Sequence, residues 1–135
     1  MKFEELCDAR YSLRKFDSRP VEAEKLQKVL EAGRKAPTAH NLQPQRFFVM
    51  QSEEALAKAD ACTACHFHPP VVIVAAYDPE IAWKREEDGK NHGEIDVTLA
   101  VSQMMLQAAD LGLGTTYVGM FNTEKLLEQL PEMKG

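Results

Sequence analysis

The sequence has no long hydrophobic run, no basic excess and no even set of cysteines. Its longest apolar stretch, residues 71–77, is far shorter than the roughly 20 residues that cross a bilayer. Residues 1–5 contain no apolar signal segment. The net charge of −5 disfavours general adhesion to nucleic acid or anionic lipid, because both require a basic surface. We therefore expect a cytoplasmic protein without a nucleic-acid or membrane partner.

Several common ligand-binding motifs are also missing. The sequence contains no glycine-rich P-loop, no Gly-x-Gly-x-x-Gly turn and no supported Ser-His-Asp set, so the usual signals of three large enzyme classes are absent. Its composition is that of an average globular protein, with 44% hydrophobic and 27% charged residues. A chain of 135 residues is in the usual range for one domain. We expect a single domain over residues 1–135.

Hydrophobic periodicity predicts alternating helices and strands. Helical spacing and capping residues predict helices over residues 3–9, 21–35, 52–60, 94–111 and 122–131. Apolar and β-branched runs predict strands over residues 46–51, 71–77 and 115–120, the second of them covered on both faces. The prediction is an α+β fold with a small central sheet wrapped by helices.

The long helix over residues 94–111 is predicted to be amphipathic. Its methionines and Leu106 are expected to fill the core or a dimer interface, and Gly112 is expected to end it as a C′ glycine. The predicted apolar face consists of Ile95, Leu99, Ser102, Met105, Leu106 and Ala109.

Two segments carry polar groups in patterns that suit a phosphorylated ring cofactor. Arg10, Ser12 and Arg14 alternate, so they would project to one side of an extended chain as a phosphate clamp. The alternative is a solvated basic stretch. Residues 36–44, fixed by two prolines and followed by an apolar strand, offer hydrogen-bonding groups beside a flat wall. The alternative there is an ordinary helix-to-strand connection.

Taken together, these segments resemble the FMN-dependent nitroreductase family. RYSLRKF is similar to the family's RxSxRxF signature, and APTAHNLQP is similar to its AP-S/T-x-x-N-x-QP loop. Trp83-Lys84-Arg85 with Asp88-Gly89, the helix GEIDVTLAVSQMMLQAADLGLGT and the segment TTYVGMF follow in the family's order. The resemblance runs from about Phe3 to Pro131. It departs from the family near Gly135, where a further strand is expected in other members.

The resemblance implies an oxidoreductase that binds FMN and transfers hydride from NAD(P)H to nitroaromatic, quinone or similar electron-poor acceptors in a ping-pong reaction. It implies a homodimer with shared active sites. No side chain is assigned as a catalytic acid or base. Arg10, Ser12 and Arg14 are expected at the FMN phosphate and ribityl chain, with Pro37, Thr38, Asn41 and Gln43 of the partner chain and Tyr117, Val118 and Gly119 around the ring.

One motif lies outside this resemblance: Cys62, Cys65, His66 and His68 in the run CTACHFH. CxxCH matches a haem attachment signal, the four side chains suggest zinc, and CxxC suggests a redox dithiol. The compressed spacing and the missing βαβ context favour partly exposed loop thiols and histidines instead, with no metal bound. Two rival functions follow from the motif. One is a flavin-binding or redox-sensing module without turnover, and the other is a zinc-bound structural domain.

Overall fold

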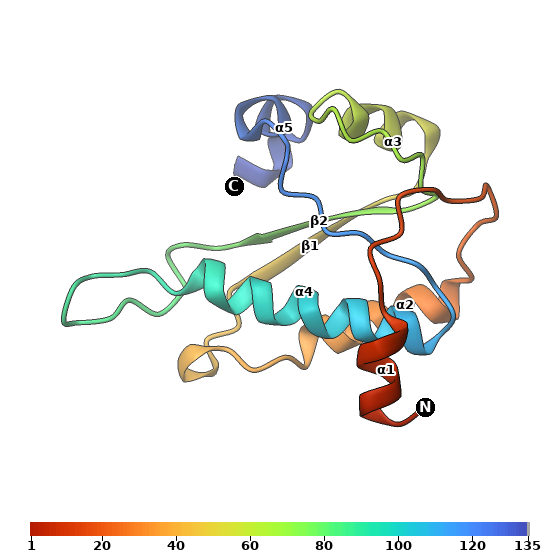
Figure 1. The fold of residues 1–135 in the computed structure, drawn as a ribbon. Helices are drawn as coiled ribbons and strands as arrows, with labels where there is room; N and C mark the ends of the chain where they lie inside the picture. The colour runs from red at the N-terminus through yellow and green to blue at the C-terminus, as the bar shows by residue number, and fades with distance from the viewer. Residues whose placement is uncertain (135) are drawn as a thin grey trace.

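The computed structural model describes residues 1–134, which form an α+β fold (Figure 1). The strands β1 (Gln45–Met50) and β2 (Val72–Tyr77) pair antiparallel, with Gln45 opposite Tyr77 and Met50 opposite Val72. The helices are α1 (Phe3–Ala9), α2 (Ala23–Arg34), α3 (Glu53–Asp60), α4 (Gly93–Asp110) and α5 (Thr123–Gln129), with short 3₁₀ turns η1 (Ala39–Asn41) and η2 (Pro131–Lys134).

The predicted helix ends are confirmed where a side chain or a glycine fixes them. Ser52 accepts a hydrogen bond from the backbone N–H of Ala55 at 3.1 Å, and so caps α3. Asn122 does the same for α5 through the N–H of Lys125, at 2.9 Å. Gly112 follows α4 with φ +78°, a conformation that side chains with a Cβ rarely adopt.

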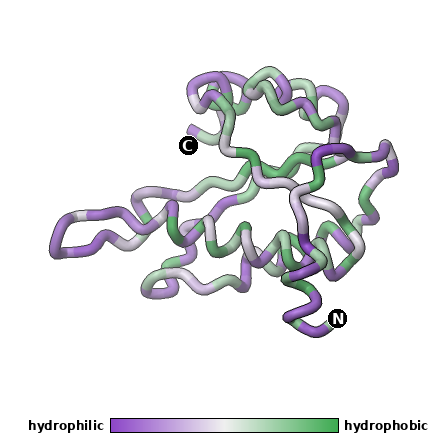
Figure 2. Tube along the Cα trace, viewed as in Figure 1, coloured by the Kyte–Doolittle hydropathy of each residue, from purple (hydrophilic) through white to green (hydrophobic). Residues whose placement is uncertain are grey.

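Helices pack on both faces of the two-stranded sheet, with α2 and α4 on one face and α3 and α5 on the other (Figure 1). Strand alternation explains the arrangement: Phe47 and Ile73 join the core of α2 and α4, while Met50 joins the core of α3 and α5. Figure 2 shows the apolar residues concentrated along the sheet and the polar residues along the protruding connection between β2 and α4.

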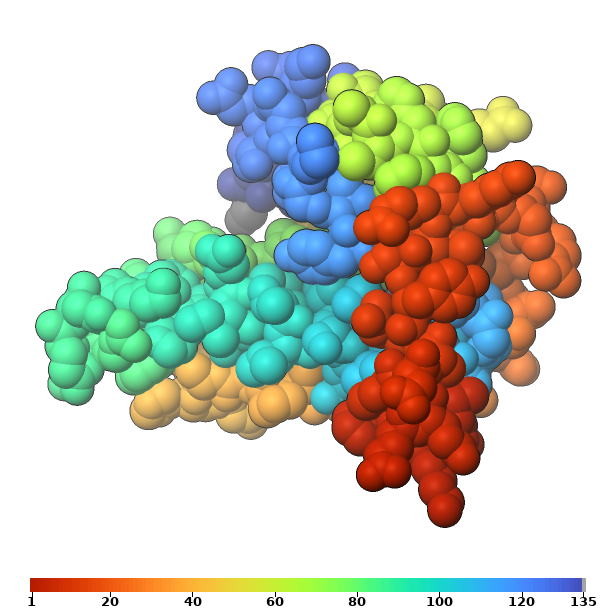
Figure 3. Space-filling model, in the orientation of Figure 1, coloured from red at the N-terminus to blue at the C-terminus, as the bar shows by residue number. Residues whose placement is uncertain are grey.

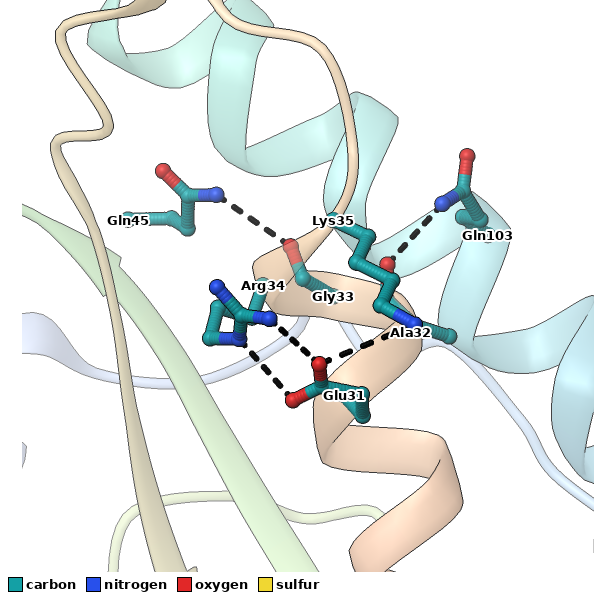
Figure 4. Close-up of polar contacts among 7 residues, drawn as sticks. All are labelled: Glu31, Ala32, Gly33, Arg34, Lys35, Gln45 and Gln103. Carbon is teal, nitrogen blue, oxygen red and sulfur yellow. Dashed lines mark hydrogen bonds and ion pairs between the residues drawn. The ribbon is translucent and has the colours of Figure 1, made fainter.

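The close packing of α2 on α4 depends on Gly33. A Cβ at this position would lie 2.5 Å from the sulfur of Met104, so only a residue without a side chain permits the contact. Two glutamine amides fasten the same region (Figure 4). Gln103 donates to the carbonyl of Ala32 at 2.9 Å, and Gln45 donates to the carbonyl of Gly33 at 3.2 Å. The end of α2 is thereby held to both α4 and β1.

The predicted third strand over residues 115–120 is wrong. Within residues 1–134 this segment pairs only through single bridges near its ends, Ser12 with Thr115 and Thr63 with Phe121. Its threonines and valine favour extended backbone, but a strand also requires a neighbour that runs alongside it. The two ends of the segment meet different parts of the chain, so no ladder forms.

The predicted apolar face of α4 is only partly the face that is buried within the chain. The buried side chains include Asp96, Val97, Ala100, Met104 and Ala108. By contrast, Ile95 is 42% exposed and Leu99 is 47% exposed. Both sets recur at helical spacing, because α4 is apolar on more than one face, and periodicity alone cannot choose between them.

The prediction that β2 is covered on both faces is partly wrong as well. Helices lie on both sides of the sheet, yet Ala75 is exposed and the other residues of the strand are half-buried. No helix among the described residues has the length and apolar character needed to span a membrane.

Candidate functional site

The Arg10–Arg14 segment lies against the C-terminal end of α4 (Figure 3). It follows α1, which ends at Ala9 because Arg10 adopts extended backbone. The backbone N–H of Leu13 donates to the carbonyl of Thr115 at 2.8 Å. Gly114 makes this approach possible, since a Cβ there would lie 2.2 Å from Cδ2 of Leu13. The predicted phosphate clamp therefore has a fixed position in the fold.

The two arginines of this segment are available to an anion. Within residues 1–134 neither Arg10 nor Arg14 makes an ion pair, and Arg14 makes one long hydrogen bond, 3.5 Å, to the carbonyl of Ser12. Arg19, in contrast, pairs with Asp17 at 3.0 Å. Ser12, which lies between the two arginines in the sequence, is exposed. In a chain of net charge −5, such unpaired cations mark a candidate anion site.

A cleft of about 300 Å³ lies at the same place. It is lined by the backbone and side chains of Ala9, Arg10, Tyr11, Leu13, Ala109, Gly112, Leu113, Gly114 and Thr115. The predicted ring-contacting residues Tyr117, Val118 and Gly119 begin two positions after Thr115. Tyr117 is 60% exposed, Val118 is half-buried and Gly119 is exposed. The bridge between Ser12 and Thr115 thus places the Arg10–Arg14 segment beside the start of the segment that carries Tyr117, Val118 and Gly119.

The loop with Pro37, Thr38, Asn41 and Gln43 is ordered by its own hydrogen bonds. The Thr38 hydroxyl accepts from the backbone N–H of Gln43 at 3.0 Å, and the Asn41 side-chain oxygen accepts from the Gln43 amide at 2.8 Å. His40, Asn41 and Gln43 have φ values of 55°, 53° and 54°. Three such residues in one short loop are unusual, and strained backbone of this kind clusters at ligand sites.

This loop lies at the other end of α4. The backbone N–H of Ala39 donates to Asp96 in the first turns of the helix, at 3.0 Å, whereas Leu13 and Thr115 lie beyond its last turn. The 14 residues from Asp96 to Asp110 span about 21 Å at the α-helical rise of 1.5 Å per residue. The structure therefore does not bring the loop together with Arg10 and Arg14 inside one chain.

The cysteine and histidine motif does not converge on a common point. Cys62 is buried in the core of α3 and α5, and its thiol donates to the carbonyl of Lys58 at 3.2 Å. Burial raises the pKa of the Cys62 thiol, which disfavours the thiolate that zinc requires. His66 contacts the carbonyl oxygens of Asp60 and Thr63. In the part of the chain that the structure describes, no three histidine, cysteine or carboxylate side chains are grouped to hold a metal ion. The expected exposure of the thiols is wrong for Cys62.

Three residues near the site were not predicted from the sequence. Asp96 is 2% exposed and holds the loop through Ala39. Trp83 stacks on His40 with ring centroids 5.0 Å apart. Gly114 permits the contact with Leu13. Of these three residues, only Asp96 could have been noticed in the sequence. It is a carboxylate within an apolar helix, and a charged residue is rarely buried on such a face unless it has a partner.

Comparisons with known proteins identify the family of the chain. The family model described as the nitroreductase family matches residues 8–68 and 58–133. The structure of a nitroreductase family protein from Clostridium difficile 630 is 40% identical, with a TM-score of 0.94, over 97% of this chain and 76% of that one. A structure from Desulfovibrio desulfuricans, solved in complex with FMN, is 26% identical with a TM-score of 0.77, over 97% of this chain and 75% of that one.

A curated relative has a name that refers to nicotinamide chemistry. The "Putative NADH dehydrogenase/NAD(P)H nitroreductase" of Archaeoglobus fulgidus is 29% identical over 93% of this chain and 72% of its own length. The family model covers nearly all of the sequence, and its match includes both the arginine segment and the strained loop. This chain belongs to the nitroreductase family.

Proposed function

We propose that this protein is an FMN-dependent oxidoreductase that transfers hydride from NAD(P)H to nitroaromatic, quinone or similar electron-poor acceptors. The observation that carries the proposal is the pair of unpaired guanidinium groups, Arg10 and Arg14, on either side of the exposed Ser12 in a member of this family. A dianionic phosphate would accept charge-assisted hydrogen bonds from the guanidinium groups of Arg10 and Arg14 and a further hydrogen bond from the Ser12 hydroxyl. The FMN complex of the Desulfovibrio relative supports FMN as the cofactor.

We also propose that two chains share each site. Residues that would hold the phosphate and residues that would frame the ring are separated by about 21 Å of α4 within one chain. A second copy would bring the loop of one chain to the arginines of the other. Tyr117, Val118 and Gly119 would contribute to the ring from the chain that holds the phosphate.

The surface of the chain supports a partner of this kind. The chain exposes 9071 Å². A compact monomer of 15.2 kDa is expected to expose about 7,100 Å². The surplus of about 1,950 Å² is of the order that an obligate interface buries. The exposed Ile95 and Leu99 give α4 a second apolar face, on which another copy could pack.

The protein's own contribution to the reaction would be binding and orientation. Bound FMN supplies the ring that accepts hydride and passes it on. Arg10 and Arg14 would hold the phosphate, and the fixed loop would present hydrogen-bonding groups of Thr38, Asn41 and Gln43 to the edge of the ring. Donor and acceptor would occupy the same exposed face in turn, which gives ping-pong kinetics.

An anaerobic titration of the purified protein with NADH tests the proposal. Protein loaded with FMN should carry an absorption band near ~450 nm, and NADH should bleach it stoichiometrically. A band that NADH leaves unchanged would favour a flavin-binding module without turnover. A protein that does not retain FMN at micromolar concentration would contradict the proposal. Zinc measured by atomic emission in the same sample tests the structural zinc domain.

A further inference from the structure

Two consecutive residues attach the loop that carries Thr38, Asn41 and Gln43 to the region around the start of α4. Ala39 donates its backbone N–H to the carboxylate of Asp96 at 3.0 Å. His40 stacks its ring on Trp83, with centroids 5.0 Å apart and an interplanar angle of 29°. Trp83 in turn meets the edge of His92, which immediately precedes α4. Both attachments lead to the start of α4.

Asp96 is unusual as a structural residue. Its side chain is 2% exposed, and one oxygen accepts from Ala39 while the other has no partner among residues 1–134. A buried carboxylate with so few hydrogen bonds lowers the stability of a fold, so packing alone does not account for it. Its position in the first turns of α4 reduces the penalty, because the positive end of the helix dipole favours a negative charge there.

The loop needs such an external attachment. His40, Asn41 and Gln43 all have positive φ values, a conformation that residues with a Cβ adopt at a cost in free energy. The side-chain hydrogen bonds within the loop link Thr38, Asn41 and Gln43 to one another, and at the C-terminal end of the loop Arg46 of β1 donates to the carbonyl of Gln43 at 3.0 Å. The bond from Ala39 to Asp96 joins residues 57 positions apart and fixes the loop to the fold.

We propose that Asp96 is a positioning residue, which holds the Thr38–Gln43 loop in the strained conformation that contacts the flavin of the partner chain. The proposal rests on the proposed function for the identity of the ligand, although the attachment itself is independent of it. Asp96 acts through Ala39 and does not contact the cofactor.

The first test compares two side chains of α4 that each form one hydrogen bond to the backbone of another segment, Asp96 as acceptor and Gln103 as donor. Asp96→Ala removes the attachment of the loop, whereas Gln103→Ala removes the bond to the Ala32 carbonyl, which fastens α2. We expect Asp96→Ala to weaken FMN binding roughly tenfold or more, as loss of a hydrogen bond to a charged group would, and Gln103→Ala to change it less than about twofold. Asp96→Asn keeps a carbonyl oxygen for the Ala39 N–H and should restore binding to near the parent level.

The second test removes the donor from the loop side and leaves the core intact. Ala39→Pro deletes the N–H at the first residue of η1, a position that suits proline, and Thr38 before it is extended, with φ −134° and ψ 154°. Ala39→Gly is the matched control, since it keeps the N–H. Ala39→Pro should weaken FMN binding as Asp96→Ala does. It also keeps the test decisive if Asp96→Ala fails to fold.

A third measurement, tryptophan fluorescence, does not require bound FMN. Trp83 is the sole tryptophan and lies against His40, so its fluorescence reports the position of the loop. In apo protein, Asp96→Ala and Ala39→Pro should shift the emission to longer wavelength, while Gln103→Ala and Ala39→Gly should not. The proposal is overturned if Asp96→Ala and Ala39→Pro leave both the tryptophan emission and the FMN affinity unchanged. It is also overturned if Gln103→Ala weakens FMN binding as much as Asp96→Ala does. Wild-type protein that fails to bind FMN contradicts the proposed function instead, and the emission measurement still decides the attachment.

Discussion

Gly114 lies so close to Leu13 that a Cβ on the glycine would come within 2.2 Å of the leucine Cδ2 atom. The Leu13 side chain packs over this glycine, next to the hydrogen bond from the Leu13 N–H to the Thr115 carbonyl that holds the Arg10–Arg14 segment against the end of α4. Gly114→Ala should therefore displace the segment, destabilise the fold by about 1–3 kcal/mol and weaken FMN binding. Thermal unfolding and an FMN titration measure the two effects.

The double variant Gly114→Ala, Leu13→Ala provides the control. Shortening the leucine removes the clash, so the double variant should bind FMN better than Gly114→Ala alone. If the double variant loses as much FMN affinity as the two single variants together, the contact does not set the position of the segment.

Arg14 and Arg19 offer a matched comparison of two exposed arginines nearby in the chain. Arg14 makes no ion pair among the described residues, while Arg19 pairs with Asp17 at 3.0 Å. Arg14→Ala should weaken FMN binding roughly ten- to a hundredfold, through loss of one charge-assisted contact of about 1.5–3 kcal/mol. Arg19→Ala should have little effect, because exposed ion pairs contribute little. Equal FMN affinities in a fluorescence-quench titration of both variants would remove Arg14 from the site.

Cys62 and Cys65 are expected to be dispensable for electron transfer. The double change Cys62→Ser, Cys65→Ser should leave NADH-driven flavin reduction within about twofold of the parent. It should nevertheless lower the unfolding midpoint, because Cys62 is buried beside Met50 and Leu126 and a hydroxyl is less well tolerated there. Rapid-mixing absorbance and thermal unfolding separate the two effects. A large loss of reduction rate with an unchanged midpoint would favour the redox-sensing alternative.

The sequence predicted the features that depend on neighbouring residues. Ser52 and Asn122 cap helices through bonds three residues away, and Gly112 ends α4 by its own backbone conformation. The features that were missed depend on contacts distant in the sequence. Asp96 binds Ala39 across 57 positions, and the segment after Thr115 forms no strand because its neighbours diverge. The sequence could not show which apolar face of α4 is buried within the chain, because the exposed face, with Ile95 and Leu99, is apolar too.

The same distinction between local features and contacts distant in the sequence applies to the candidate site. The residue types and spacing of Arg10, Ser12 and Arg14 indicated a phosphate clamp, and the structure adds that its cations are unpaired. The composition of residues 36–44 indicated a polar loop beside an apolar strand. Its strained backbone and its attachment to α4 could not be predicted, because both arise from tertiary contacts.

The separation of the two halves of the site along α4 leads to a complementation test. Arg14→Glu reverses the charge at the proposed phosphate position. Thr38→Trp places a bulky ring in the loop at a residue whose extended backbone, with φ −134°, accepts it, and it also removes the hydroxyl that accepts from Gln43. Homodimers of either variant should have two damaged sites and little NADH-dependent nitroreductase activity.

Mixed dimers of the two variants should regain one working site. One of their sites combines both changes, and the other combines the unaltered Arg14 of one chain with the unaltered Thr38 of its partner. Random pairing makes half of the dimers mixed, and each of these has one intact site of two, so activity should rise to at most about a quarter of wild type. Affinity tags of two kinds would isolate the mixed dimer, in which about half of the wild-type activity is expected. A purified mixed dimer as inactive as its parents would mean that Arg14 and Thr38 serve the same site within one chain. The separation of about 21 Å along α4 argues against that outcome, because the neighbouring residues Leu13 and Ala39 are bonded to Thr115 and Asp96 at opposite ends of the helix.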